Sequence, residues 1–387
     1  MKINYLFYFA IINIISSSII PIPFEYINGE IAIQIQQSKN KITCYIDILN
    51  DKNIIPEMIN QNSKTKRQYE YKDPTLSFFD RLEGKKSVTL YDDWFYINNI
   101  GFIMKYYVSP NINKCIISFS KDQTEGESLI NILYMNKKIS TNGFGIKYNE
   151  PNDNNDIKGI IYLGGLPEEE KKGLYSFSYK SSIFDAILNI KDWNLEIEFA
   201  SVNTKENTFP IDLFSKGYID LKREEVLVTP EFYAFLFDHI YGFYIKEDSC
   251  AVENDNLVCD CKELKNIKSF ESITFNIGGL VMTFNIENSF IKMDNKCYFI
   301  FKRHNDDFFI LGRYFWQNYK LEFLNKNQII FYSKNKFNIK KISSLKKFPI
   351  IILRVIIHYP KISFLIIIII IISFVNAYGD KNKVKIN

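Results

Sequence analysis

The sequence predicts an all-β protein with a few short helices, and three observations support this fold class. Short runs that alternate apolar and polar residues recur from Tyr26 to Tyr332, and alternation with a period of two is typical of half-buried strands. Phenylalanine and tyrosine are abundant, with 33 and 25 copies, and aromatic residues favour strands. Polar turns separate the runs, which indicates short strands in closed or packed sheets.

Individual elements follow from these patterns. The clearest predicted strands are Glu30 to Ile35, Val88 to Ile97, Gly159 to Leu163, Ile273 to Ile277 and Leu321 to Phe331. Helical patterns predict two helices, Glu127 to Met135 and Pro230 to Tyr241, the second with proline in its first turn. Asn-rich, charged stretches at Asn50 to Tyr71 and Asn149 to Lys158 are predicted loops.

The N-terminus has the features of a secretory signal peptide over residues 1–18. Met1-Lys2 precedes an apolar stretch from Tyr5 to Ile15, and three serines follow. A buried first strand and a retained anchor are the alternatives. The apolar stretch is shorter than a full membrane span, which favours the signal peptide.

A transmembrane helix is predicted at residues 362–378. These 17 residues are uncharged and include seven consecutive isoleucines, and a spanning helix needs about 17–25 apolar residues. Residues 336–361 are predicted to form a juxtamembrane linker. Residues 379–387 contain three lysines and are predicted to form a cytosolic tail. Together the two ends predict a single-pass type I protein of the secretory pathway or cell surface, with its folded part lumenal or extracellular.

In a secretory context the cysteines indicate disulfides. The late cluster predicts one or two bridges, and Cys297 has two candidate partners, Cys261 being preferred to Cys259. Cys44 and Cys115 lie in apolar runs and are predicted to be buried thiols. No metal or cofactor is expected, because Cys259-Asp260-Cys261 lacks a second pair at zinc spacing.

Charge and motifs argue against several function classes. The net charge of +4 is spread along the chain, which does not suggest nucleic-acid binding. The sequence contains no Gly-x-Ser-x-Gly elbow, no glycine-rich phosphate loop and no His-Glu-x-x-His motif.

Several segments resemble, in order, the motifs of pepsin-like aspartic proteases. They are Tyr26 to Ile33 (the opening strand), Tyr45 to Pro56 (the first Asp-Thr-Gly segment), Lys114 to Ser120, Gly159 to Pro167 (a Leu-Gly-Gly turn), and Phe309 to Phe315, close to Ile-Leu-Gly-Asp-x-Phe. The second catalytic segment corresponds to Gly217 to Arg223, followed by Leu227 to Tyr233. The chain is therefore identified as a divergent, membrane-anchored relative of that family.

The resemblance implies a bilobed fold, with an N-terminal lobe at 24–158 and a C-terminal lobe at 159–335. Asp47 and Asp220 stand at the positions of the two catalytic aspartates, one in each lobe. A peptide or protein segment would bind in the cleft between the lobes, and the protein would be a monomer. Without the resemblance, both aspartates would be ordinary turn residues at strand ends.

The residues beside both aspartates depart from the family pattern. Ile48-Leu49 and Leu221-Lys222 replace Thr-Gly, although that glycine lets backbone amides approach the carboxylates. Apolar neighbours also favour a neutral carboxyl group, and Lys222 is positioned to pair with Asp220. Cys115 and Ser118 replace further glycines, and Phe79 to Gly84 offers no flap tyrosine.

Three interpretations follow. The favoured one is a catalytically impaired homologue that binds peptide or protein in the interlobe cleft. The alternative is a divergent but active aspartic endopeptidase that uses Asp47 and Asp220. A third is a structural surface protein whose cleft is filled. The sequence leaves the question of enzymatic activity open.

Overall fold

The computed structural model describes residues 19–27, 30–37, 40–48, 53–57, 59, 66–71, 88–109, 113–120, 128–149, 158–180, 193–242, 250–253, 256–264, 271–293, 295–324 and 328–339. The predicted signal peptide, membrane span and cytosolic tail lie outside these residues. Within the described ranges, no helix is long and apolar enough to cross a membrane. The chain divides into residues 1–338 and 339–387, and the description below concerns the first unit.

The all-β prediction is confirmed, since most described residues belong to three sheets. The largest sheet has 13 strands: β1 (Ile20–Ile27), β2 (Glu30–Gln37), β3 (Asn40–Asp47), β4 (Ile54–Pro56), β5 (Arg67–Tyr71), β6 (Val88–Ile97), β7 (Ile100–Ser109), β8 (Cys115–Ser118), β9 (Gly143–Tyr148), β10 (Lys158–Leu163), β11 (Tyr175–Lys180), β23 (Lys320–Leu324) and β24 (Gln328–Ser333).

The second sheet has eight strands: β12 (Asn194–Asn203), β13 (Thr208–Ile219), β14 (Val226–Val228), β17 (Ser272–Ile277), β18 (Leu280–Asn285), β21 (Phe301–Arg303), β22 (Phe309–Leu311) and β25 (Asn338–Ile339). The third has four: β15 (Cys250–Glu253), β16 (Asn256–Asp260), β19 (Phe290–Met293) and β20 (Lys296–Phe299). The described helices are α4 (Leu129–Met135), α5 (Glu168–Lys171), α7 (Pro230–Leu236), η1 (Phe237–Tyr241), α9 (Cys261–Leu264), η2 (Ile286–Asn288) and α10 (Arg313–Trp316).

The predicted strands correspond to β2, β6, β10 and β17, and the last predicted run divides into the hairpin partners β23 and β24. Both predicted helices are present. The second begins as α7, with the Thr229 hydroxyl accepting a bond from the Phe232 amide at 3.3 Å, and continues as the π-helix η1. The loop prediction for 50–71 is wrong in part. Two short strands lie there because each finds partners in the sheet: β4 pairs with β7 and β8, and β5 pairs with β6.

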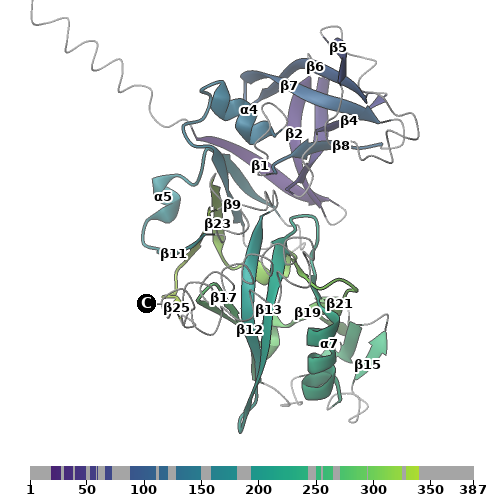
Figure 1. Cartoon of the computed structure of the whole chain (residues 1–387), viewed down its shortest axis with the longest axis vertical. Coiled ribbons are helices and arrows are strands. Elements are labelled where there is room, and N and C mark those ends of the chain that lie inside the picture. Colours follow the sequence, from purple (N-terminus) through teal and green to yellow (C-terminus); the bar gives the residue numbers. More distant parts are fainter. Residues whose placement is uncertain are drawn as a thin grey trace, which may run out of the picture. The chain divides into compact units, whose positions relative to one another are not determined.

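Six antiparallel strands join the first and second halves of the chain, in the order β1-β10-β9-β23-β24-β11. β1, β10, β9 and β11 precede residue 181, and β23 and β24 follow residue 319. The early and late strands meet where β11 pairs with β24 and where β9 pairs with β23 (Figure 1). At that junction the rings of Phe144 and Phe323 stack with centroids 4.6 Å apart, and Trp193 packs against Phe323 at 5.1 Å.

One four-strand arrangement occurs twice. In the first module, formed by β3, β8, β4 and β7, β3 is parallel to β8, β8 antiparallel to β4, and β4 parallel to β7. In the second module, formed by β13, β22, β14 and β21, the corresponding pairs have the same directions. Asp47 is the last residue of β3, and Asp220 directly follows β13. The fold therefore places the two aspartates at equivalent strand ends.

The structure contains three disulfides, which confirms the prediction of disulfide bonding. Cys261 is bonded to Cys297, and Cys250 to Cys259. The prediction that Cys44 and Cys115 are thiols is wrong, because they form the third bond. The parallel register of β3 and β8 sets these two residues opposite each other, with Cα atoms 4.5 Å apart, within the range that a disulfide spans.

Candidate functional site

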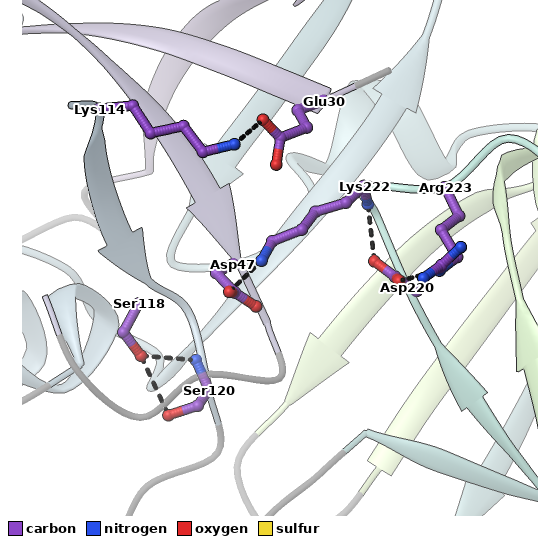
Figure 2. Close-up of polar contacts among 8 residues, drawn as sticks. All are labelled: Glu30, Asp47, Lys114, Ser118, Ser120, Asp220, Lys222 and Arg223. Carbon is purple, nitrogen blue, oxygen red and sulfur yellow. Dashed lines mark hydrogen bonds and ion pairs between the residues drawn. The ribbon is translucent and has the colours of Figure 1, made fainter. Parts of the chain in front are cut away.

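Asp47 lies at the end of the first module's strand β3 and is 4% exposed. Its carbonyl oxygen accepts a hydrogen bond from the Phe119 amide at 2.8 Å, which fixes the backbone at the strand end. Its side chain faces the segment that carries Asp220 (Figure 2). The chain therefore holds a buried carboxylate in a fixed position between the modules.

Asp220 occupies the equivalent place in the second module and is 6% exposed. Its amide donates to the Leu311 carbonyl at 3.1 Å. One carboxylate oxygen accepts the Lys222 amide at 2.8 Å, an Asx-type turn. The other oxygen lies 3.3 Å from Nε of Arg223. Asp220 is thus held by its own following residues.

Lys222 connects the two aspartates. Its backbone amide bonds Asp220, while its side chain extends to the other module and its ammonium pairs with the Asp47 carboxylate (Figure 2). The expectation that the Lys222 side chain pairs with Asp220 is therefore wrong. Because the turn directs the amide of residue 222 towards Asp220, the side chain is free to reach Asp47, and Arg223 pairs with Asp220 instead.

Electrostatics at the site differ from those of a pair of carboxylates that share one proton. Burial raises the pKa of Asp220; the Lys222 amide and the charges of Arg223 and Lys222 oppose that rise, and the Asp47 carboxylate adds to it. Two acids and two cations stand together. In a proton-sharing dyad, mutual repulsion separates the two pKa values, whereas here each carboxylate has a cation of its own.

The segment beneath Asp47 is held by a polar network. The Ser118 amide donates to Oδ1 of Asn53 at 2.9 Å, and the Asn53 amide group donates to the Lys105 carbonyl at 3.1 Å. The Ser118 hydroxyl bonds that of Ser120 at 3.1 Å. The hydroxyl and the amide of Ser118 therefore both have hydrogen-bond partners inside the fold.

The second module keeps a glycine at the corresponding position. A Cβ on Gly312 would lie 2.1 Å from the Glu225 carbonyl oxygen, closer than any side chain can approach. Ile48 and Leu221, which directly follow the two aspartates in the sequence, are 1% and 0% exposed and belong to the hydrophobic core. They anchor the segments that follow the two aspartates by apolar packing.

Trp193 ties the two modules together. Its indole nitrogen donates to the Phe119 carbonyl at 3.3 Å, next to Asp47. Its own carbonyl accepts the Ile219 amide at 3.0 Å, next to Asp220. Sequence reasoning missed Trp193, Asn53 and Arg223. Of these, only Trp193 gave a signal, as one of three tryptophans in the chain.

Two further expectations concern ligands and the flap. Among the described residues, no group of three His, Cys, Asp or Glu side chains could hold a metal ion. The segment Phe79 to Gly84, where the flap would lie, is outside the described residues.

The chain matches no protein-family model and no curated protein. Functional reasoning therefore depends on the geometry of the site.

Proposed function

We propose that the chain is a membrane-anchored pepsin-like protein in which Lys222 blocks the aspartate pair, and that it binds a peptide or protein segment between its lobes without cleaving it. Two features support the family assignment. The four-strand module occurs twice, with an aspartate at the same strand end each time, and six antiparallel strands join the two halves. The ordered motifs of the sequence fall on these elements.

The ion pair between Lys222 and Asp47 carries the proposal that catalysis is impaired. Aspartic proteolysis needs one carboxylate to take a proton from a water molecule and the other to donate a hydrogen bond to the scissile carbonyl. The Lys222 ammonium occupies an Asp47 oxygen that would otherwise hold the water molecule.

The remaining parts of the proposal rest on sequence. Residues 362–378 would anchor the protein, with the folded part lumenal or extracellular. Three disulfides suit an oxidising compartment. Peptide or protein binding between the lobes follows from the resemblance, and the protein would act as a monomer.

One observation favours the alternative, an active endopeptidase. Asp47 and Asp220 are both buried and stand at equivalent positions. Activity would require the Lys222 side chain to leave Asp47 when substrate binds. The same assay decides between the two functions.

The test is a cleavage assay on the purified full-length protein in detergent, with a peptide library at pH 3–7 and products identified by mass spectrometry. Variants Asp47→Ala and Lys222→Ala are compared with Lys114→Ala, which removes a lysine paired with Glu30 elsewhere on the first half. We expect no cleavage by the wild type and retention of intact peptides. Cleavage that Asp47→Ala abolishes would overturn the proposal, and failure to retain any peptide would overturn its binding part.

A further inference from the structure

The hairpin of β6 and β7 (Figure 1) carries large apolar side chains on both of its faces. On the inner face, Phe95 and Phe102 are 0% and 2% exposed and belong to the core. On the outer face, Trp94, Tyr96 and Ile103 are 46%, 37% and 42% exposed. The solvated face of an antiparallel sheet normally carries polar residues, and exposed apolar patches often mark interaction sites.

These three outer side chains form one continuous patch, called the outer patch below. Trp94 is directly opposite Ile103 across the hairpin, and Tyr96 is directly opposite Gly101, so all four residues share a face. A Cβ on Gly101 would lie 3.0 Å from the Tyr96 ring and 3.5 Å from the Trp94 ring. Both rings therefore lie over Gly101, and they adjoin each other there.

Cations flank one end of the outer patch. In the next row of the same face, Asp92 of β6 stands between Arg67 of β5 and Lys105 of β7. Both cations are exposed, and neither forms an ion pair within the described part of the chain. This row therefore presents two cations and one acid to solvent.

A third cation flanks the other end. Gln36 of β2 is directly opposite Tyr96 on one side and Lys41 of β3 on the other, so these residues also share the outer face. Lys41 is exposed and likewise forms no ion pair with a described residue. Three cations and one acid give the surroundings of the outer patch a positive formal charge.

We propose that the outer patch binds the surface of a bilayer that contains anionic lipids. Tryptophan and tyrosine favour the interface between membrane and water, because each has an apolar ring system and a polar group. The negative potential of an anionic leaflet attracts lysine and arginine. An apolar centre between cations matches both parts of such a surface, the acyl boundary and the head groups.

Charge and polarity favour a bilayer over two other occupants. A second copy bound through the same patch would bring the cations of both copies together, with one acid from each to offset them. A nucleic acid would pair with the cations, but its phosphates would leave the apolar centre without a partner. The function proposed above makes no use of the outer patch, so each of the two proposals can hold without the other.

The experiment measures contact between Trp94 and lipid. Trp193 and Trp316 are 4% and 1% exposed, so Trp94 is the one of the chain's three tryptophans that lipid can reach. The full-length protein is reconstituted into vesicles of phosphatidylcholine, with or without phosphatidylserine, whose acyl chains carry bromine as a quencher. In anionic vesicles we expect quenching of about a third of the tryptophan emission, because one indole of three reaches the lipid. Trp94→Phe should abolish this quenching.

Removal of the flanking charge should weaken the contact. Each cation near an anionic leaflet strengthens binding roughly five-fold. The double variant Arg67→Gln/Lys105→Gln should therefore lower the quenching most of the way to its level in phosphatidylcholine alone. Lys296→Gln, which removes an exposed lysine paired with Glu253 in another sheet, is the matched control and should leave the quenching unchanged. Thermal unfolding checks that each variant is folded.

Three results would overturn the proposal: no quenching in anionic vesicles, quenching that Trp94→Phe retains, or equal quenching in neutral and anionic vesicles. Protection of Trp94 from acrylamide in detergent that increases with protein concentration would identify a second copy as the occupant, and would overturn the proposal as well. Lys222→Ala should not alter the quenching, so failure of this test leaves the proposal for the aspartate pair standing.

Discussion

Replacing Lys222 by methionine tests whether the lysine is the counter-charge of the blocked aspartate pair. The Asp47 side chain is 6% exposed, and its partner's is 30% exposed. Breaking a buried ion pair costs about 3–5 kcal/mol, because one charge stays buried without compensation. Since the lysine is partly solvated, we expect Lys222→Met to lower the free energy of unfolding by about 3 kcal/mol.

The neighbouring cation provides the matched control. Arg223 pairs with Asp220, but its side chain is 48% exposed, and exposed pairs contribute at most about 1 kcal/mol. Arg223→Met should therefore lower the free energy of unfolding by about 1 kcal/mol or less. The two variants remove cations from adjacent residues. The partner acids are similarly buried, at 6% and 9%, so the exposure of the cation, 30% for Lys222 and 48% for Arg223, distinguishes the two pairs.

The double variant Asp47→Asn/Lys222→Met completes a cycle. With both charges gone, no buried ion remains unpaired, so most of the loss in Lys222→Met should be recovered, with a coupling energy of about 2 kcal/mol. Urea unfolding of the full-length protein, followed by tryptophan fluorescence, measures the wild type, Asp47→Asn, Lys222→Met, the double variant and the control Arg223→Met. Equal losses in Lys222→Met and Arg223→Met would refute the reasoning, and so would a double variant no more stable than Lys222→Met.

Three further predictions concern stability and are measured by urea unfolding. Glu170→Gln should lower the free energy of unfolding by about 2 kcal/mol at pH 7. Burial raises the pKa of Glu170, but hydrogen bonds from two lysines and a tyrosine outweigh burial and lower the pKa from 4.5 to about 2. This stabilisation is therefore present above pH 4.5 and is lost as the pH falls towards 2. An unchanged difference at pH 2 would contradict this. Replacing both Cys44 and Cys115 by alanine, 71 residues apart, should cost about 4 kcal/mol through the freed loop; a loss below about 1 kcal/mol would show that the bond adds little. Gly312→Ala should cost about 2–3 kcal/mol because its Cβ meets a carbonyl oxygen at 2.1 Å, whereas Gly242→Ala, whose nearest atom is at 3.5 Å, should stay within about 1 kcal/mol; equal effects would contradict the steric argument.

Local patterns were sufficient for much of the secondary structure. Alternation along Val88 to Ile97 predicted β6 with its observed bounds, because side chains of a strand with one buried face repeat every two residues. Pro230 likewise marked the start of α7. Both signals depend on a few adjacent residues, so no knowledge of the fold was needed.

Contacts between distant segments could not be predicted in this way. Cys44 reads as a small apolar residue, and only the register of β3 on β8 shows that it faces Cys115. Lys222 and Asp47 are 175 positions apart. Their pairing depends on the direction that the Lys222 side chain takes after the turn at Asp220. The motif resemblance located the two aspartates, but it carried no information about which cation each would hold.

The six-strand sheet between the halves has a consequence for how the chain is made. β9 pairs with β23, and β11 pairs with β24, and these partners are among the last strands to leave the ribosome. During synthesis, the edges of β9 and β11 therefore stay unpaired until β23 and β24 emerge, when most of the chain has already been made. Exposed edges of this kind recruit foreign strands. Truncation before residue 320 would leave both edges open permanently.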